Sequence, residues 1–158
     1  MKIKINTNTE LIKGIQGLKD ARLQVGWFED SKYEDGTPIA NVAFWQEYGT
    51  SRGIPMRPFM RPAEFNNKEK WVNLFAQEIK KAIQSKKNVK DAMEVLGLVV
   101  QGDIQNEISM VFNPPLKDST IKARLRRRKV KKITASLTKP LIDTGMMFDS
   151  VQHKVEEC

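Results

Sequence analysis

Cysteine and histidine, the side chains most often used for nucleophilic catalysis and zinc binding, each occur once in this 158-residue chain, as Cys158 and His153. A tetrahedral zinc site takes about four such ligands, so one chain does not supply it. A catalytic triad or a Cys–His pair needs a histidine base beside its nucleophile, and His153 is the single candidate. We therefore predict no internal disulfide, metal or cofactor, and a protein that is not an enzyme.

One acidic motif offers a different chemistry. The segment Leu141-Ile142-Asp143-Thr144-Gly145 resembles the active-site segment of aspartic proteases, in which two aspartates share a proton. A second copy of the chain would have to supply the second aspartate. That protease fold consists almost entirely of strands, whereas helical patterns dominate this sequence. We therefore favour a helix-capping role for Asp143 or Thr144.

Positive charge is concentrated in one segment. The chain has a net charge of +8, of which residues 117–139 carry +9 and the remainder −1. Such asymmetry indicates a local contact with a polyanion or an acidic protein, and a merely solvated loop is the alternative. Aromatic residues do not interleave the basic ones, so base stacking is not expected. The candidate contact residues are Lys122, Arg124, Arg126, Arg127, Arg128, Lys129, Lys131 and Lys132.

A proline-rich loop is the second candidate contact region. In Arg57-Pro58-Phe59-Met60-Arg61-Pro62, two prolines restrict the backbone between arginine and phenylalanine side chains. Arginine and phenylalanine are favoured in interface cores, so Arg57, Phe59 and Arg61 are candidate subunit contacts. The alternative is a rigid entry into the next helix, with Phe59 in the core.

Two long helices are the clearest elements that position these regions. Apolar residues recur at spacings of three and four on both sides of residues 86–88, which predicts a helix opened by Pro62 and a second one capped by Asn88. The short break between them predicts an antiparallel hairpin. Their apolar positions are Trp71, Leu74, Phe75, Ile79, Ala82 and Ile83 in the first helix, and Val89, Met93, Leu96, Val100, Ile104, Ile108 and Val111 in the second.

Shorter elements complete a predicted α+β domain. Alternating residues predict strands over 1–5, 21–28 and 151–155. Short helices are predicted over 11–18, from Thr37-Pro38 to Gly49, over 118–128 and over 146–148, with a basic loop at about 126–139. In the second of these, the predicted core face holds Ile39, Ala40, Ala43, Phe44 and Tyr48. We expect one domain over 1–158, with a small antiparallel sheet packed against the long helix hairpin. No apolar run is long enough for a membrane-spanning helix, so we expect no membrane partner.

The order of several short motifs resembles the tail-completion and head–tail joining proteins of tailed bacteriophages, including minor tail protein Z and Mu-type virion-morphogenesis proteins. The resemblance covers about residues 23–155. The motifs are Val25-Gly26-Trp27-Phe28, Asp35-Gly36-Thr37-Pro38-Ile39-Ala40, Glu47-Tyr48-Gly49-Thr50, Ile54-Pro55-Met56-Arg57-Pro58-Phe59, Pro115-Leu116 with Ser119-Thr120-Ile121, and Pro140-Leu141-Ile142-Asp143-Thr144-Gly145 with Ser150-Val151.

The resemblance implies a structural virion protein at the head–tail junction, assembled in the host cytoplasm. Such a protein forms a ring, usually of six copies, that ends tail growth or joins the tail tube protein to the head connector and stopper proteins. DNA leaves through the lumen of the ring, and the basic segment would then either face that DNA in a non-specific contact or lean on an acidic neighbouring ring. The resemblance also places residues 47–62 near a subunit boundary, which adds Glu47 to the interface candidates.

The basic stretch 126–139 is longer than the family pattern leads us to expect, so its partner stays open. A small DNA-binding or packaging-accessory protein that uses residues 117–139 is the alternative function.

Overall fold

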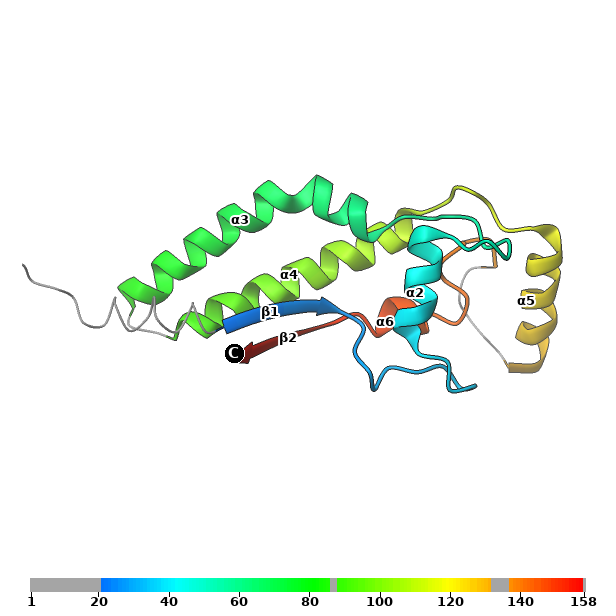
Figure 1. Ribbon diagram of the computed structural model, residues 1–158, viewed down its shortest axis with the longest axis horizontal. Coiled ribbons are helices and arrows are strands. Elements are labelled where there is room, and N and C mark those ends of the chain that lie inside the picture. The colour runs from blue at the N-terminus through cyan, green and yellow to red at the C-terminus, as the bar shows by residue number, and fades with distance from the viewer. Residues whose placement is uncertain (1–20, 86–87, 132–136, 158) are drawn as a thin grey trace, which may run out of the picture.

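The computed structural model describes residues 21–85, 88–131 and 137–157, and Figure 1 shows two long helices lying along a small sheet. The strand predicted over 1–5 and the helix predicted over 11–18 lie outside the described residues. The elements in chain order are β1 (Ala21–Gly26), α2 (Ile39–Tyr48), α3 (Met60–Gln84), α4 (Val89–Met110), α5 (Asp118–Lys131), α6 (Met146–Asp149) and β2 (Gln152–Glu157).

The long helices α3 and α4 pack as the predicted antiparallel hairpin. Asp103 of α4 ties them together, because its carboxylate accepts a hydrogen bond from Trp71 Nε1 at 2.7 Å and pairs with Lys70 Nζ at 2.7 Å. The predicted cap of α4 is confirmed, since the side-chain oxygen of Asn88 accepts a hydrogen bond from the Lys90 N–H at 3.0 Å.

The sheet joins the two ends of the described chain. Strands β1 and β2 pair antiparallel, with Ala21 opposite Glu157 and Gly26 opposite Gln152, and both strands pack on α4. The α+β class and the packing of a small antiparallel sheet on a helix hairpin are therefore confirmed. Apolar side chains from the hairpin, α2, α6 and the loops share one core: Ile39, Ala43, Phe59, Ala63, Val100, Ile104, Ile108, Leu141, Met147 and Val151.

Gly97 allows β2 to approach α4 closely. The ring of His153 lies so near that a Cβ added at Gly97 would meet the His153 Cδ2 atom at 2.4 Å. The ring is held there by Gln101 Oε1, 2.9 Å from Nδ1, and by Glu94 Oε2, 3.0 Å from Nε2. Gly102, five residues further along the same helix, is exposed and has no atom within 4 Å of such a Cβ among the described residues.

Replacement by alanine is therefore expected to change stability in opposite directions at the two glycines. Gly97→Ala is expected to lower the free energy of unfolding by about 1–3 kcal/mol, because the added methyl displaces the His153 ring. Gly102→Ala is expected to raise it by about 0.5–1 kcal/mol, because alanine has the higher helix propensity. Urea denaturation of the two variants measures both effects, and an equal rise in both would refute the close contact.

The buried face of α2 differs from the predicted one. Ile39, Ala43 and Glu47 face the core, whereas Phe44 and Tyr48 are 60% and 54% exposed. Spacings of four residues place the three buried side chains on one helix face. The prediction is therefore confirmed for Ile39 and Ala43 and wrong for Phe44 and Tyr48, in whose place Glu47 is buried.

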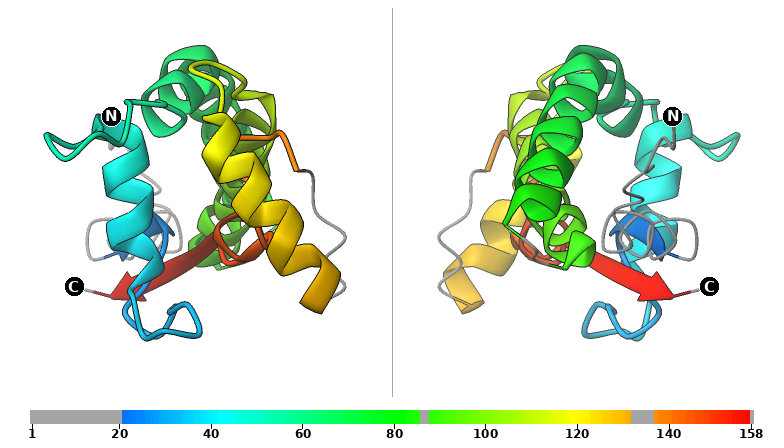
Figure 2. Two further views of the ribbon diagram at one scale, coloured as in Figure 1. Left: turned by 90° about the vertical axis from the view of Figure 1, so that its right-hand side faces the viewer. Right: turned by 90° about the vertical axis from the view of Figure 1, so that its left-hand side faces the viewer.

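Helix α5 is longer than predicted and lies apart from the long hairpin (Figure 1). It continues to Lys131, so residues 126–131 of the predicted basic loop are helical, while 132–136 lie outside the described residues. The correction has a simple cause, because arginine and lysine are good helix formers and residues 116–139 contain neither glycine nor proline. The end-on views in Figure 2 place α2 on one flank of the molecule and α5 on the other.

Candidate interaction surface

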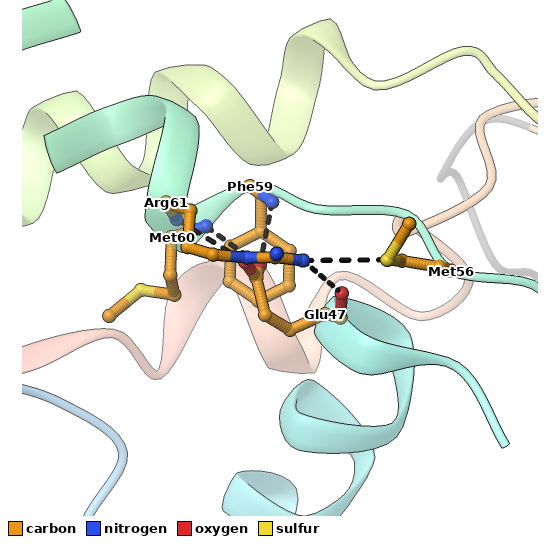
Figure 3. Close-up of polar contacts among 5 residues, drawn as sticks. All are labelled: Glu47, Met56, Phe59, Met60 and Arg61. Atoms are coloured by element: carbon orange, nitrogen blue, oxygen red, sulfur yellow. Dashed lines mark hydrogen bonds and ion pairs between the residues drawn. The ribbon is translucent and has the colours of Figure 1, made fainter. Parts of the chain in front are cut away.

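Glu47 connects the end of α2 to the start of α3 (Figure 3). Its carboxylate accepts hydrogen bonds from the backbone N–H groups of Phe59 at 2.7 Å and Met60 at 2.9 Å, and from that of Arg61 at 3.3 Å. The same carboxylate pairs with Arg61 Nε at 2.8 Å. Glu47 is only 3% exposed, so this network is internal to the chain.

The Glu47 network caps the N-terminus of α3. The first N–H groups of a helix have no intrahelical partner, and the N-cap residue Phe59 carries no side-chain acceptor. A carboxylate from another helix therefore takes the place of the usual Ser, Thr, Asp or Asn cap, at the end of the helix that favours negative charge. Burial alone would raise the pKa of Glu47, but the hydrogen bonds from Phe59, Met60 and Arg61 outweigh burial and lower it.

Arg57 fixes the loop between α2 and α3 to a distant part of the chain. Its Nε donates to the carbonyl of Pro114 at 2.8 Å and its Nη2 to that of Pro115 at 3.1 Å, while Nη1 donates to Gln46 Oε1 at 3.1 Å. Burial lowers the pKa of Arg57, and the positive charge of Arg124 lowers it further. Loop 49–59 is thus held near its C-terminal end, with α2 on one side and the α4–α5 connection on the other.

The structure places most of the interface candidates inside the chain. Glu47, Arg57 and Phe59 are 3%, 5% and 0% exposed, so the prediction that their side chains contact a second subunit does not fit their position. The alternative expectation for Phe59, a place in the core, is confirmed. Arg61 has a half-exposed side chain and stays a candidate.

Exposed apolar side chains surround Arg61 and form what we call the aromatic patch, defined by Phe44, Tyr48, Met56 and Phe65. Phe65 is 87% exposed and Met56 is 52% exposed. The Phe44 and Tyr48 rings lie 4.8 Å apart, and the Arg61 guanidinium lies 5.0 Å from the Tyr48 ring centre. Arg61 Nη2 also approaches the Met56 sulfur at 3.4 Å, so Arg61 links the members of the patch.

A shallow groove of about 420 Å³ lies beside Arg61 at one edge of the aromatic patch, between Met56 and Phe65. Its walls come from the fixed loop and the first turns of α3, namely Met56, Pro58, Arg61, Pro62, Phe65 and Asn66. Exposed apolar side chains that are gathered on a rigid support are typical of protein–protein contact sites. The sequence contains one signal for this patch, because Phe65 lies outside the apolar stripe that continues through Trp71 and Leu74.

Arg124 anchors α5 to the chain that follows it. Its Nη1 donates to the carbonyls of Lys139 at 2.7 Å and Ile142 at 3.1 Å, and its Nη2 donates to that of Pro140 at 3.0 Å. Its Nε also lies 3.4 Å from Asp143 Oδ1. Arg124 is 7% exposed, so its predicted role as a partner or DNA contact does not fit, and it acts as an internal support.

Asp143 lies in a salt bridge on this support. Arg127 Nη2 is 2.6 Å from Asp143 Oδ2, so each carboxylate oxygen has an arginine neighbour. An aspartic protease instead places its catalytic carboxylate against a second one. Thr144 Oγ1 accepts a long, 3.4 Å hydrogen bond from the Met146 N–H, but the N-cap residue of α6 is Gly145, which has no side chain to cap with.

A cleft of about 240 Å³ opens beside this salt bridge, between Tyr33 and Gln46 on one side and the 140–147 segment on the other. Burial raises the pKa of Tyr33, and the charges of Asp143 and Asp35 raise it further. Within the part of the chain that the structure describes, there is no group of three or more His, Cys, Asp or Glu side chains that could hold a metal ion.

The remaining basic candidates differ in position and exposure. Lys122 and Arg126 are exposed on α5, and Arg127 is half exposed beside Asp143. Arg128, Lys129 and Lys131 belong to α5, and Lys132 lies outside the described residues. The helix predicted over 118–128 therefore extends to Lys131 and takes in the first part of the predicted basic loop.

No protein-family model matches the chain, and neither a curated protein nor a solved structure is significantly similar to it. Among the described helices, none combines the length and the apolar character that crossing a membrane requires.

Proposed function

We propose that this protein is a structural subunit of a tailed-phage virion that completes the tail and joins it to the head connector. In this proposal several copies form a ring, with six as the expected number, around the path by which DNA leaves the head. The tail tube protein on one side and the connector or stopper proteins on the other are its neighbours. The order of the motifs from Val25 to Val151 supports the family, and the α+β fold is compatible with it.

The observation that carries the proposal is the aromatic patch on its rigid support. Four large apolar side chains lie 52–87% exposed on a loop and two helices that Glu47 and Arg57 hold in place. Leaving such side chains in water forgoes hydrophobic stabilisation, and a repeated subunit contact recovers it. The position of the patch, within residues 44–65, overlaps the segment 47–62 that the resemblance places at a subunit boundary.

The double substitution of Phe44→Ser and Phe65→Ser tests the patch. Both residues are exposed, so we expect little change in thermal stability. We expect self-association to weaken by about tenfold or more, because buried aromatic residues in an interface commonly contribute more than 1 kcal/mol each. Sedimentation velocity across a concentration series measures the change.

The matched control is the pair Val72→Ser and Leu98→Ser, since these two side chains are each 60% exposed but lie outside the aromatic patch. The control is expected to associate like the wild type. Equal behaviour of the two double variants would show that the patch is not a subunit contact.

A DNA-binding or packaging-accessory function is the second candidate. The exposed basic side chains Lys122 and Arg126 on α5 favour it, because lysine and arginine neutralise phosphates with little sequence preference. Binding of the protein to duplex DNA, with an affinity that falls steeply as salt rises, would support this function. Weak DNA binding that does not change with Lys122→Glu and Arg126→Glu would exclude this function.

A further inference from the structure

Two exposed surfaces of opposite charge lie on this chain. The loop 29–36 between β1 and α2 carries four acidic residues and one basic residue, a net charge of −3. Its acidic side chains, including Glu29 and Asp30, are exposed. The segment 117–139 carries +9 and presents Lys122 and Arg126 on α5. Each surface has the charge that the other would attract.

The acidic loop is an ordered surface. The Tyr33 N–H donates to the Thr37 carbonyl at 2.9 Å, and the Thr37 N–H donates to Asp35 Oδ1 at 2.9 Å. The Ile39 N–H donates to the Ser31 carbonyl at 2.9 Å, which ties the loop to the start of α2. The loop therefore presents its carboxylates from a fixed backbone.

The two surfaces lie on either side of one cleft, which Tyr33 of the loop and Arg127 of α5 both line. In the left view of Figure 2, α2 and the loop that precedes it are on one side, and α5 is on the other. Lys122 and Arg126 are four residues apart and lie on the face of α5 that is turned away from the buried Arg124 and from the cleft. They and the exposed acidic side chains of the loop are therefore placed to meet between copies, in a head-to-tail contact that can close into a ring.

We infer that α5 of one copy docks against the α2 flank of a second copy, with its basic side chains on the acidic loop 29–36. The inference rests on the proposed function, because it names the partner surface in the proposed ring. The two elements are of comparable length, about 15 Å for the ten residues of α2 and about 21 Å for the fourteen of α5. Surface ion pairs contribute little each, so charge sets the orientation and apolar contact supplies the affinity.

Apolar groups are present on both sides of this contact. On α5, Leu125 is 43% exposed one helical turn from Lys122. On the opposite flank, α2 exposes Phe44 and Tyr48, whose rings attract arginine and lysine as well as apolar side chains. A DNA backbone offers Lys122 and Arg126 a charge partner, but it offers Leu125 none, so a second copy fits α5 better.

Two charge-reversed variants test the inference. The first carries Lys122→Glu and Arg126→Glu, and the second carries Glu29→Lys and Asp30→Lys. All four side chains are exposed, so both variants are expected to fold, which circular dichroism and thermal unfolding verify. A control with Lys68→Glu and Lys80→Glu makes the same change in net charge as the first variant, on exposed positions of α3.

Sedimentation velocity is run on each protein between about 0.05 and 0.5 M NaCl, the range over which screening becomes strong. We expect the wild type and the control to associate, and to do so more weakly at high salt. For each reversed variant we expect a dissociation constant at least about tenfold higher. Mixing the two variants is expected to restore association, because each then meets a surface of opposite charge. Unchanged association of either variant, or a mixture that stays dissociated, overturns the inference.

Two further results separate this inference from other accounts. If the first variant loses duplex DNA binding but associates normally, α5 is a nucleic-acid surface and the inference is wrong. If the wild type associates and the reversed variants do not, while a phage that lacks the gene makes normal particles, the contact stands and the proposed virion function fails. If the reversed variants associate normally and the phage that lacks the gene makes defective particles, the function stands and this contact fails.

Discussion

Replacement of Glu47 by alanine is expected to lower the free energy of unfolding by about 2–4 kcal/mol. The substitution removes the acceptor of the N–H groups of Phe59, Met60 and Arg61 at the start of α3. Phe59 is fully buried, so its N–H has no ready access to water. The substitution also removes the ion pair between Glu47 and Arg61, the residue that links the members of the aromatic patch, while the bonds from Arg57 to Gln46 of α2 remain. Urea denaturation measures the loss.

The pH dependence of stability separates the charge of Glu47 from its hydrogen bonds. The pKa of Glu47 is lowered in the folded protein, so its contribution is fully present above the ordinary glutamate pKa of about 4.3. That contribution is lost as pH falls through the lower folded pKa, because protonation then occurs in both states. Glu47→Gln has no charge to lose, so the stability difference between the wild type and this variant is expected to shrink below about pH 4. A difference that stays constant from neutral to acid pH would contradict the capping role.

Replacement of Arg124 by methionine is the second substitution with a large expected effect. Methionine keeps much of the side-chain volume but provides no donor for the carbonyls of Lys139, Pro140 and Ile142. We expect the free energy of unfolding to fall by about 2–4 kcal/mol. The substitution removes hydrogen bonds to a charged group and leaves the carbonyls poorly solvated. Without this anchor, α5 and the 139–143 segment are expected to separate from one another.

Arg126→Met on the same helix is the matched control, since Arg126 is exposed. Its effect on stability is expected to stay within about 0.5 kcal/mol. Hydrogen exchange of the α5 amides gives a second readout, with faster exchange expected in the Arg124 variant and not in the control. Equal protection in both variants would mean that Arg124 does not hold α5 in place.

Local signals predicted the helix hairpin well. Trp71 and Leu74 in α3, and Val100 and Ile104 in α4, repeat at helical spacing, and Asn88 is a residue type that caps helices. Alternating residues also predicted the two strands, at 21–28 and 151–155, that pair with one another in the structure. These elements depend on neighbouring residues, which the sequence displays directly.

The roles of the buried charged residues could not be predicted in the same way. Arg57 bonds to carbonyls 57 and 58 positions away, and Glu47 caps a helix that begins thirteen residues later. Such contacts depend on tertiary structure, and arginine and glutamate are exposed in most proteins. The same limit explains why α2 was predicted to bury Phe44 instead of Glu47.

Electron microscopy of a lysate from the source phage or prophage, with this gene deleted, tests the proposed virion function most directly. The proposal predicts filled heads beside unattached tails, with over-long tails if termination is the principal role and tails of normal length if joining is. A plasmid copy of the wild-type gene is expected to restore infectious particles, and a copy with Phe44→Ser and Phe65→Ser is not. Normal, infectious particles from the deletion strain would contradict the proposal.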